Sequence, residues 1–213
     1  MAVYFQIGTN DGNDLFNSLV KSVKPKLVIL VEPNIALVQE IKRNYKDVEN
    51  VHIFNNAIYY HSDMEVELYI PASNGVYGSK ADNGFTYTDS HFSLLPMNDW
   101  ASKDDMCKIK AKTITFDDIC EEFGIKTIDY LQIDTEGFDS EILKMIDLDK
   151  FNIKKIRFEN WGFDEHCFMR HHENWKELGK VGVSKAIQKL TKYNYKISSI
   201  NDTDGNDILA VKC

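Results

Sequence analysis

Two short runs of apolar residues near the start of the chain predict buried strands. They cover residues 3–7 and 27–31, contain β-branched residues and show no helical period. Continuous runs of this kind are typical of strands that are buried on both faces of a sheet. Between them, apolar residues at helical spacing follow Asp14, which we expect to cap a helix. The chain therefore begins with a strand, a turn, a helix and a second strand.

The later part of the chain repeats this alternation and predicts a mostly parallel sheet. Further strands are expected at residues 50–58, 128–133, 155–161, 195–200 and 207–212. Helical patterns separate most of them, and right-handed crossovers make parallel pairing the economical arrangement. A turn-rich loop joins the last two strands, so we expect the chain to end in a hairpin whose last strand runs antiparallel to the rest.

One segment, at about residues 72–108, interrupts this order. It is rich in Gly, Ser, Asn and Asp and carries several aromatic residues. Long loops in a domain of this size are usually functional, and the aromatic content argues for order. We expect residues 1–213 to form one α/β domain with a substrate-facing insertion at about 72–108. A surface loop without a role in binding is the alternative.

Composition and charge exclude several classes of partner. The chain is 43% hydrophobic and 27% charged, which is ordinary for a globular protein. Its net charge of -8 and the lack of a Lys/Arg run disfavour a nucleic-acid partner. No apolar run approaches the length of a membrane span, and the start has no signal-peptide pattern. We therefore expect a cytoplasmic protein without a membrane partner, whose four cysteines are reduced thiols.

The turn after the first strand has the features of a cofactor-binding loop. It consists of two glycines with polar side chains between them: Gly8, Thr9, Asn10, Asp11 and Gly12. The next helix begins above the strand end, where open α/β sheets hold their ligands. Side chains in this loop would crowd a pyrophosphate, and Asp11 would repel it. They suit a ligand with an amino-acid end, such as S-adenosylmethionine; a tight turn without a binding role is the alternative.

Residues at the next two strand ends extend this candidate site. Glu32 ends the second strand twenty residues after Gly12, and Pro33 stops that strand. The two oxygens of a carboxylate at this place suit the two hydroxyls of a ribose. Asn56 ends the third predicted strand, where its amide either pairs with an adenine edge or belongs to an ordinary turn. Together these residues favour a nucleoside-containing cofactor.

Three carboxylates follow the fourth predicted strand within six residues. They are Asp134, Glu136 and Asp139. Asp139 is expected to cap the next helix. Asp134 still belongs to the apolar run of the strand, so a role beside the cofactor explains it better than a cap. We expect Asp134 and Glu136 to be functional.

These segments together resemble the FkbM family of class I S-adenosylmethionine-dependent methyltransferases. The resemblance is carried by Ile7–Gly12, Val31–Asn34, Asn56–Ala57, Ser93–Leu95, and Thr113–Asp117 leading to Asp129–Gly137. The last segment is the most specific, because it contains a strand that runs into I-D-x-E-G. The fold implied is a Rossmann-like α/β fold. It has a mostly parallel seven-stranded sheet, helices on both faces and an antiparallel C-terminal strand.

The resemblance implies methyl transfer from S-adenosylmethionine to a hydroxyl of a sugar or other small metabolite. The sulfonium is an activated donor, so the protein mainly holds the acceptor in line and removes a proton. The residues implied to hold the cofactor are Gly8, Thr9, Asn10, Asp11, Gly12, Glu32, Pro33, Asn56, Ala57 and Asp134.

A general base is the second requirement that the resemblance implies. The candidates are Glu136, then Asp134, then His91 of the insertion, with Glu159 at the end of the fifth strand as a further one. A Mg²⁺ ion held by Asp134, Glu136 and Glu159 would also lower the pKa of an acceptor hydroxyl. The spacing of these residues does not require such an ion.

Two other functions stay open at this point. A nicotinamide-dependent oxidoreductase also uses a glycine turn and a later acid, but the middle glycine of its G-x-G-x-x-G motif is missing here. A non-catalytic module that binds S-adenosylmethionine is the second alternative. It is favoured by Gln6, because the family's first motif usually begins with an acid there. The charge that faces the methionine ammonium is then missing or supplied by Asp11.

Overall fold

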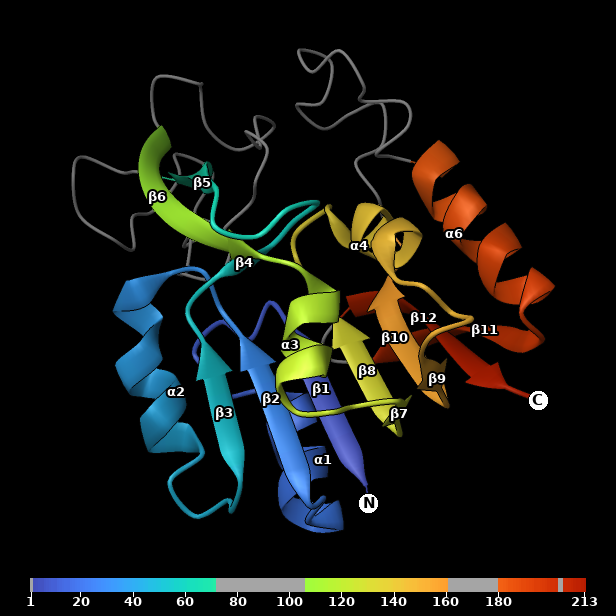
Figure 1. Cartoon of the computed structure of the whole chain (residues 1–213), viewed down its shortest axis with the longest axis horizontal. Coiled ribbons are helices and arrows are strands. Elements are labelled where there is room, and N and C mark those ends of the chain that lie inside the picture. The colour runs from blue at the N-terminus through green and yellow to red at the C-terminus, as the bar shows by residue number, and fades with distance from the viewer. Residues whose placement is uncertain (1, 72–105, 161–179, 203–204) are drawn as a thin grey trace.

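A seven-stranded sheet forms the centre of the molecule. The structure is a computed structural model that describes residues 2–71, 106–160, 180–202 and 205–213 (Figure 1). The strands, in their order across the sheet, are β11 (Tyr195–Asp202), β12 (Gly205–Lys212), β10 (Lys155–Glu159), β8 (Tyr130–Ile133), β1 (Val3–Ile7), β2 (Leu27–Val31) and β3 (Val51–Phe54). Neighbouring strands run parallel except at β12, which is antiparallel to β10 and β11. The predicted mostly parallel sheet with an antiparallel C-terminal strand is confirmed.

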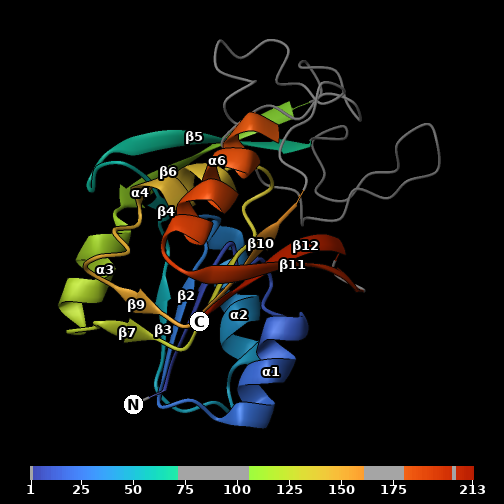
Figure 2. The same ribbon diagram turned by 90° about the vertical axis from the view of Figure 1, so that its right-hand side faces the viewer.

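Helices cover both faces of this sheet, as the sequence predicts. They are α1 (Leu15–Val23), the 3-10 helix η1 (Ile35–Leu37), α2 (Val38–Asn44), α3 (Phe116–Glu122), α4 (Asp139–Met145) and α6 (Lys180–Lys192). Figure 2 shows the sheet from its side, with α1 and α2 against one face and α3 and α4 against the other. The larger core lies on the face of α3, α4 and α6 and includes the fully buried Phe5, Leu131 and Phe158. A smaller core around Phe16 and Ile41 lies under α1 and α2.

Side-chain caps determine where two of these helices begin. Oδ1 of Asp14 accepts the backbone N–H of Asn17 at 2.8 Å and caps α1, as predicted. Oγ1 of Thr115 accepts the backbone N–H of Asp118 at 3.0 Å and caps α3. Each cap of this kind stabilises a helix by about 1 kcal/mol. Helix α1 therefore begins directly behind the glycine turn.

Three further strands form a separate sheet above the carboxyl ends of the central strands (Figure 1). They are β4 (Ala57–Ile58), β6 (Met106–Ile114) and β5 (Glu65–Pro71), in that spatial order. The prediction of one strand over residues 50–58 is therefore wrong in its second half. The Asn55 side chain donates to the backbone carbonyl of Glu32 at 2.8 Å, which competes with continued strand pairing. The chain then leaves the central sheet, and β4 pairs with β6.

The predicted insertion at residues 72–108 begins and ends at this small sheet. Strands β5 and β6 pair antiparallel on either side of it, and its last residues belong to β6. Residues 72–105, among them His91, lie outside the described residues. Two further short strands, β7 (Thr127–Ile128) and β9 (Asn152–Ile153), pair outside the central sheet, which the sequence does not predict.

Candidate active site

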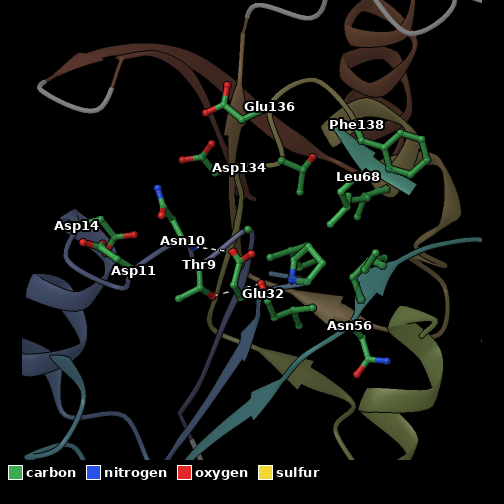
Figure 3. A pocket seen from close by; sticks show the side chains of 18 of the residues that line it. Thr9, Asn10, Asp11, Asp14, Glu32, Asn56, Leu68, Asp134, Glu136 and Phe138 are labelled. Carbon is green, nitrogen blue, oxygen red and sulfur yellow. Dashed lines mark hydrogen bonds between the residues drawn. The ribbon is translucent and has the colours of Figure 1, made fainter. Parts of the chain in front are cut away.

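A cavity of about 410 Å³ lies at the carboxyl edge of the central sheet (Figure 3). The last residues of β1, β2 and β8 lie opposite one another in the strand register. The residues that follow them, Gly8, Glu32 and Asp134, therefore meet at this edge. The predicted cofactor residues that line the cavity are Gly8, Thr9, Asn10, Asp11, Glu32, Pro33, Asn56, Ala57 and Asp134, and Glu136 lines it as well. Gly12 is not among the lining residues.

The two glycines of the first loop shape this cavity. Gly8 and Gly12 both have positive φ angles, +81° and +73°. A Cβ atom on Gly8 would lie 1.7 Å from the backbone oxygen of Asp134, so a side chain there would push β1 and β8 apart. A Cβ atom on Gly12 would lie 3.0 Å from the ring of Tyr45. Gly8 thus shapes the cavity directly, and Gly12 acts through the packing behind the loop.

Glu32 connects the first two loops of the site. Its Oε2 accepts the backbone N–H of Asn10 at 2.7 Å, and its Oε1 accepts that of Asn34 at 2.8 Å. Burial raises the pKa of Glu32 to about 7, although these two hydrogen bonds lower it. A carboxylate offers about four lone-pair positions, so each oxygen keeps one for a ribose hydroxyl. Glu32 is therefore placed both to hold the loop and to contact a ligand.

A tight turn after β8 contains two of the carboxylates that line the cavity, Asp134 and Glu136. Glu136 has a φ of 53° and Gly137 a φ of 107°. In Figure 3 the carboxylates of Asp134 and Glu136 lie one above the other and point to the same side. Oδ1 of Asp139 holds this turn, because it accepts the backbone N–H of Thr135 at 2.8 Å as well as its hydroxyl. The prediction that Asp139 caps the next helix is wrong. Asp139 is the first residue inside α4, and the N-cap residue before it makes no side-chain hydrogen bond.

Carboxyl groups dominate the polar lining of the cavity, and a bound cation would favour their ionised forms. They are Asp11, Asp14, Glu32, Asp134 and Glu136, and no Lys, Arg or His is found among the described residues that line it. Such a cavity favours a cationic ligand and opposes an anionic one. A dinucleotide brings a pyrophosphate, whereas S-adenosylmethionine brings an ammonium and a sulfonium. The residues present therefore fit S-adenosylmethionine.

Burial and mutual repulsion raise the pKa values of the carboxyl groups in the turn after β8. For Glu136, burial is the larger cause and the charge of Asp139 the smaller, and together they raise its pKa to about 8. Burial also raises the pKa of Asp134 well above its usual range, and the charge of Glu136 adds to this shift. A general base works best when its pKa lies near the operating pH. The carboxyl group of Glu136 is therefore suited to proton transfer.

An apolar wall faces the acidic loop across the cavity. Figure 3 shows Leu68 and Phe138 on the side opposite Asp11 and Asp14. Leu68 comes from β5 and Phe138 precedes α4, so the small upper sheet contributes to the cavity. Asp14 and Leu68 line the cavity but are not predicted to do so from the sequence. Asp14 had a usable signal, its place at the helix start next to the loop, whereas Leu68 depends on a contact between distant segments.

Two predicted residues differ from expectation: Glu159 does not line the cavity, and Asn56 lines it with its amide turned away. Glu159 ends β10 and is not among the lining residues; its backbone N–H donates to Asp139 at 3.0 Å. Burial, followed by the charge of Asp134, raises the pKa of Glu159 well above its usual range. Asn56 lies between β3 and β4, and in Figure 3 its amide points away from the other labelled side chains.

In the described part of the chain, no three His, Cys, Asp or Glu residues are grouped to hold a metal ion, so the geometry gives the Mg²⁺ alternative no support.

A search of protein families matches residues 6–197 to the methyltransferase FkbM domain. The chain belongs to the FkbM methyltransferase family. This membership confirms the expected family and its cofactor, S-adenosylmethionine, and it does not support the nicotinamide alternative. A search of curated proteins returned no match.

Solved structures with a fold similar to this FkbM domain include several methyltransferases. The O-methyltransferase from Bacillus cereus in complex with SAH is 9% identical, with a TM-score of 0.50 over 99% of this chain and 74% of that chain. The precorrin-6y C5,15-methyltransferase from Geobacter metallireducens is 12% identical, with a TM-score of 0.46 over 99% and 80%. A SAM-dependent methyltransferase from Aquifex aeolicus is 12% identical, with a TM-score of 0.44 over 100% and 82%. At these identities the likeness is one of fold.

Proposed function

We propose that this FkbM domain transfers the methyl group of S-adenosylmethionine to a hydroxyl oxygen of a sugar or other small metabolite. The observation that carries the proposal is the pair of carboxylates, Asp134 and Glu136, at the cavity beside the glycine loop. A hydroxyl is a weak nucleophile and must lose its proton as the methyl is transferred. A nearby carboxylate with a raised pKa can take that proton.

The lining residues divide the proposed work between binding and proton transfer. Glu32 would accept from the ribose hydroxyls, and the loop from Gly8 to Asp11 would hold the methionine end. Ala57 and Pro33 would pack against the adenine. The bound cofactor supplies an activated methyl group, so no further activation of the donor is needed. The protein's remaining task is to align the acceptor and remove its proton.

Glu136 is the proposed general base, and Asp134 is the second candidate. Both come from the same turn, and their negative charges would also stabilise the neighbouring sulfonium. His91 remains a candidate from the insertion, outside the described residues. Glu159 is a weaker candidate, because it is not among the residues that line the cavity.

Charge and composition support a small acceptor. The chain has a net charge of -8, and the acidic cavity would repel a phosphate backbone. None of the described helices is long and apolar enough to cross a membrane. A neutral, hydroxyl-rich molecule such as a sugar would be repelled neither by the net charge of the chain nor by the acidic cavity.

The test uses S-adenosylmethionine with an isotope-labelled methyl group and a panel of sugars and hydroxylated metabolites. The chemical shift of the labelled carbon in the product distinguishes an O-methyl from an N-, S- or C-methyl group. We expect O-methyl products. Labelled methyl on nitrogen, sulfur or carbon would contradict the proposal. Cofactor binding without transfer to any component of a complete cell extract would instead support the non-catalytic module.

A further inference from the structure

Gln6 and Asp14 form a pair beneath the loop that follows β1. The Gln6 side chain is fully buried, and its Nε2 donates to Oδ2 of Asp14 at 2.5 Å. Asp14 lines the cavity, whereas Gln6 is not among the lining residues. Figure 3 shows Asp14 beside Asp11, on the side of the cavity that this loop forms. The pair therefore holds a carboxylate at the cavity from below.

An acid in place of Gln6 would disturb this pair. Two carboxylates at this distance repel each other unless they share a proton. The amide at position 6 donates a hydrogen bond instead, so the negative charge stays on Asp14. This accounts for the departure from the acid with which the family's first motif usually begins: the chain carries the charge eight residues later.

We propose that the carboxylate of Asp14 binds the α-ammonium of S-adenosylmethionine and that Gln6 orients it. Oδ1 of Asp14 accepts the backbone N–H of Asn17 at 2.8 Å, Oδ2 accepts from Gln6, and the same carboxylate lines the cavity. Donors from β1 and α1 hold the carboxylate in one orientation, which lowers the entropic cost of binding. The proposal rests on the family's cofactor and does not depend on the proposed acceptor.

Asp11, for which the sequence suggested this role, is used differently. Its Oδ1 accepts the backbone N–H of Asn13 at 2.9 Å, in a turn within the loop itself. Asp14 instead accepts hydrogen bonds from β1 and α1, and its negative charge also acts on the carboxyl group of Asp134. There it contributes to the raised pKa of that carboxyl, after larger contributions from burial and Glu136. An ammonium bound by Asp14 would reduce this repulsion.

The test measures two ligands by isothermal titration calorimetry. S-adenosylhomocysteine carries the α-ammonium, and its deamino analogue keeps the carboxylate and lacks only that group. We expect the preference for S-adenosylhomocysteine over the analogue to fall by roughly 10- to 100-fold in Asp14→Asn, the range for losing a charge-assisted hydrogen bond. Asp47→Asn, at an exposed position that does not line the cavity, is the matched control and is expected to keep the preference. Asparagine is itself a good helix cap, so Asp14→Asn is expected to leave α1 intact.

Two results would overturn the assignment. Either the preference stays unchanged in Asp14→Asn, including the case in which both ligands weaken equally because the loop is damaged, or the preference is lost in Asp11→Asn instead. The double variant Gln6→Glu with Asp14→Asn restores a hydrogen bond between the two side chains and moves the charge below the cavity. We expect it to recover stability relative to Gln6→Glu alone but not the ligand preference. A recovered preference would contradict the role of Asp14.

Discussion

The carboxylate of Asp139 accepts a hydrogen bond from the backbone N–H of Glu159 at 3.0 Å. Its other oxygen accepts the backbone N–H of Thr135 at 2.8 Å, so one buried side chain joins α4 to the ends of β8 and β10. The turn between β8 and α4 contains Glu136 with a φ of 53°. A non-glycine residue with such a left-handed backbone conformation costs on the order of 1–3 kcal/mol, and it persists when the surrounding structure holds it in place. Asp139 therefore keeps the turn in the shape that presents Glu136 to the cavity.

Replacing Asp139 by asparagine is expected to reduce turnover more than cofactor affinity. Asparagine keeps the size of the side chain but has one acceptor oxygen, so one backbone N–H group loses its partner. A small displacement of Glu136 should lower kcat by about 10²-fold, while the Kd for S-adenosylhomocysteine stays close to the wild-type value. Ser140→Ala is the control, because the buried Ser140 hydroxyl makes no hydrogen bond within the described residues. Equal losses of kcat in the two variants would contradict the positioning role.

Gly8→Ala is expected to destabilise the fold far more than Gly124→Ala. Both glycines have a positive φ, +81° and +61°, but a Cβ atom on Gly124 would meet nothing within 4 Å. Gly124→Ala should therefore cost about 1 kcal/mol, from the backbone conformation alone. Gly8→Ala must also displace the backbone of Asp134. Urea unfolding of both variants measures the difference, and similar free energies of unfolding would show that the close approach at Gly8 does not matter.

Glu32→Ala should weaken the binding of S-adenosylmethionine by roughly 1.5–3 kcal/mol, the range for hydrogen bonds to a charged group. The variant loses the proposed acceptors for the ribose and the hydrogen bond to the backbone N–H of Asn10. Isothermal titration calorimetry measures the loss. Glu40→Ala serves as the control, because Glu40 lies on the surface of α2 in an ion pair with Arg43. An affinity equal to that of the wild type would remove Glu32 from the site.

The raised pKa of Glu136 predicts a stability that falls as the pH rises. Its pKa is about 8 in the folded protein, against an ordinary value of 4.5. The folded state therefore binds this proton more tightly than the unfolded chain does. The resulting stabilisation is complete below the ordinary pKa and is lost as the pH rises through about 8. The urea midpoint of the ligand-free protein should fall less steeply across this range in Glu136→Gln, and identical slopes would refute the burial of a titrating group.

The parts of the site that follow from strand ends could be predicted from the sequence. Buried apolar runs identify β1, β2 and β8, and parallel pairing then brings Gly8, Glu32 and Asp134 to one edge. The cap at Asp14 could also be predicted, because a short polar side chain before an amphipathic run is a local signal. The acidic character of the cavity follows from the same residues. These inferences depend on local pattern and on the handedness of crossovers.

Contacts between distant segments could not be predicted in this way. The Asn55 side chain bonds to the carbonyl of Glu32, which turns β4 out of the central sheet. Asp139 looks like a helix cap in the sequence, yet its partners include Glu159, twenty residues away. The pairing of Gln6 with Asp14 depends on how the loop folds over the strand. A side chain's partner across the fold has no periodicity that a sequence pattern can show.

Glu136→Gln tests the central claim most directly. The variant keeps the shape of the side chain and removes the proposed base. With an acceptor identified by the labelled-methyl assay, initial rates and titration of S-adenosylhomocysteine are measured on the same preparations. We expect the rate of O-methyl transfer to fall by about 10²–10⁴-fold while the affinity for S-adenosylhomocysteine stays close to that of the wild type. An unchanged rate would contradict the assignment of Glu136 as the base.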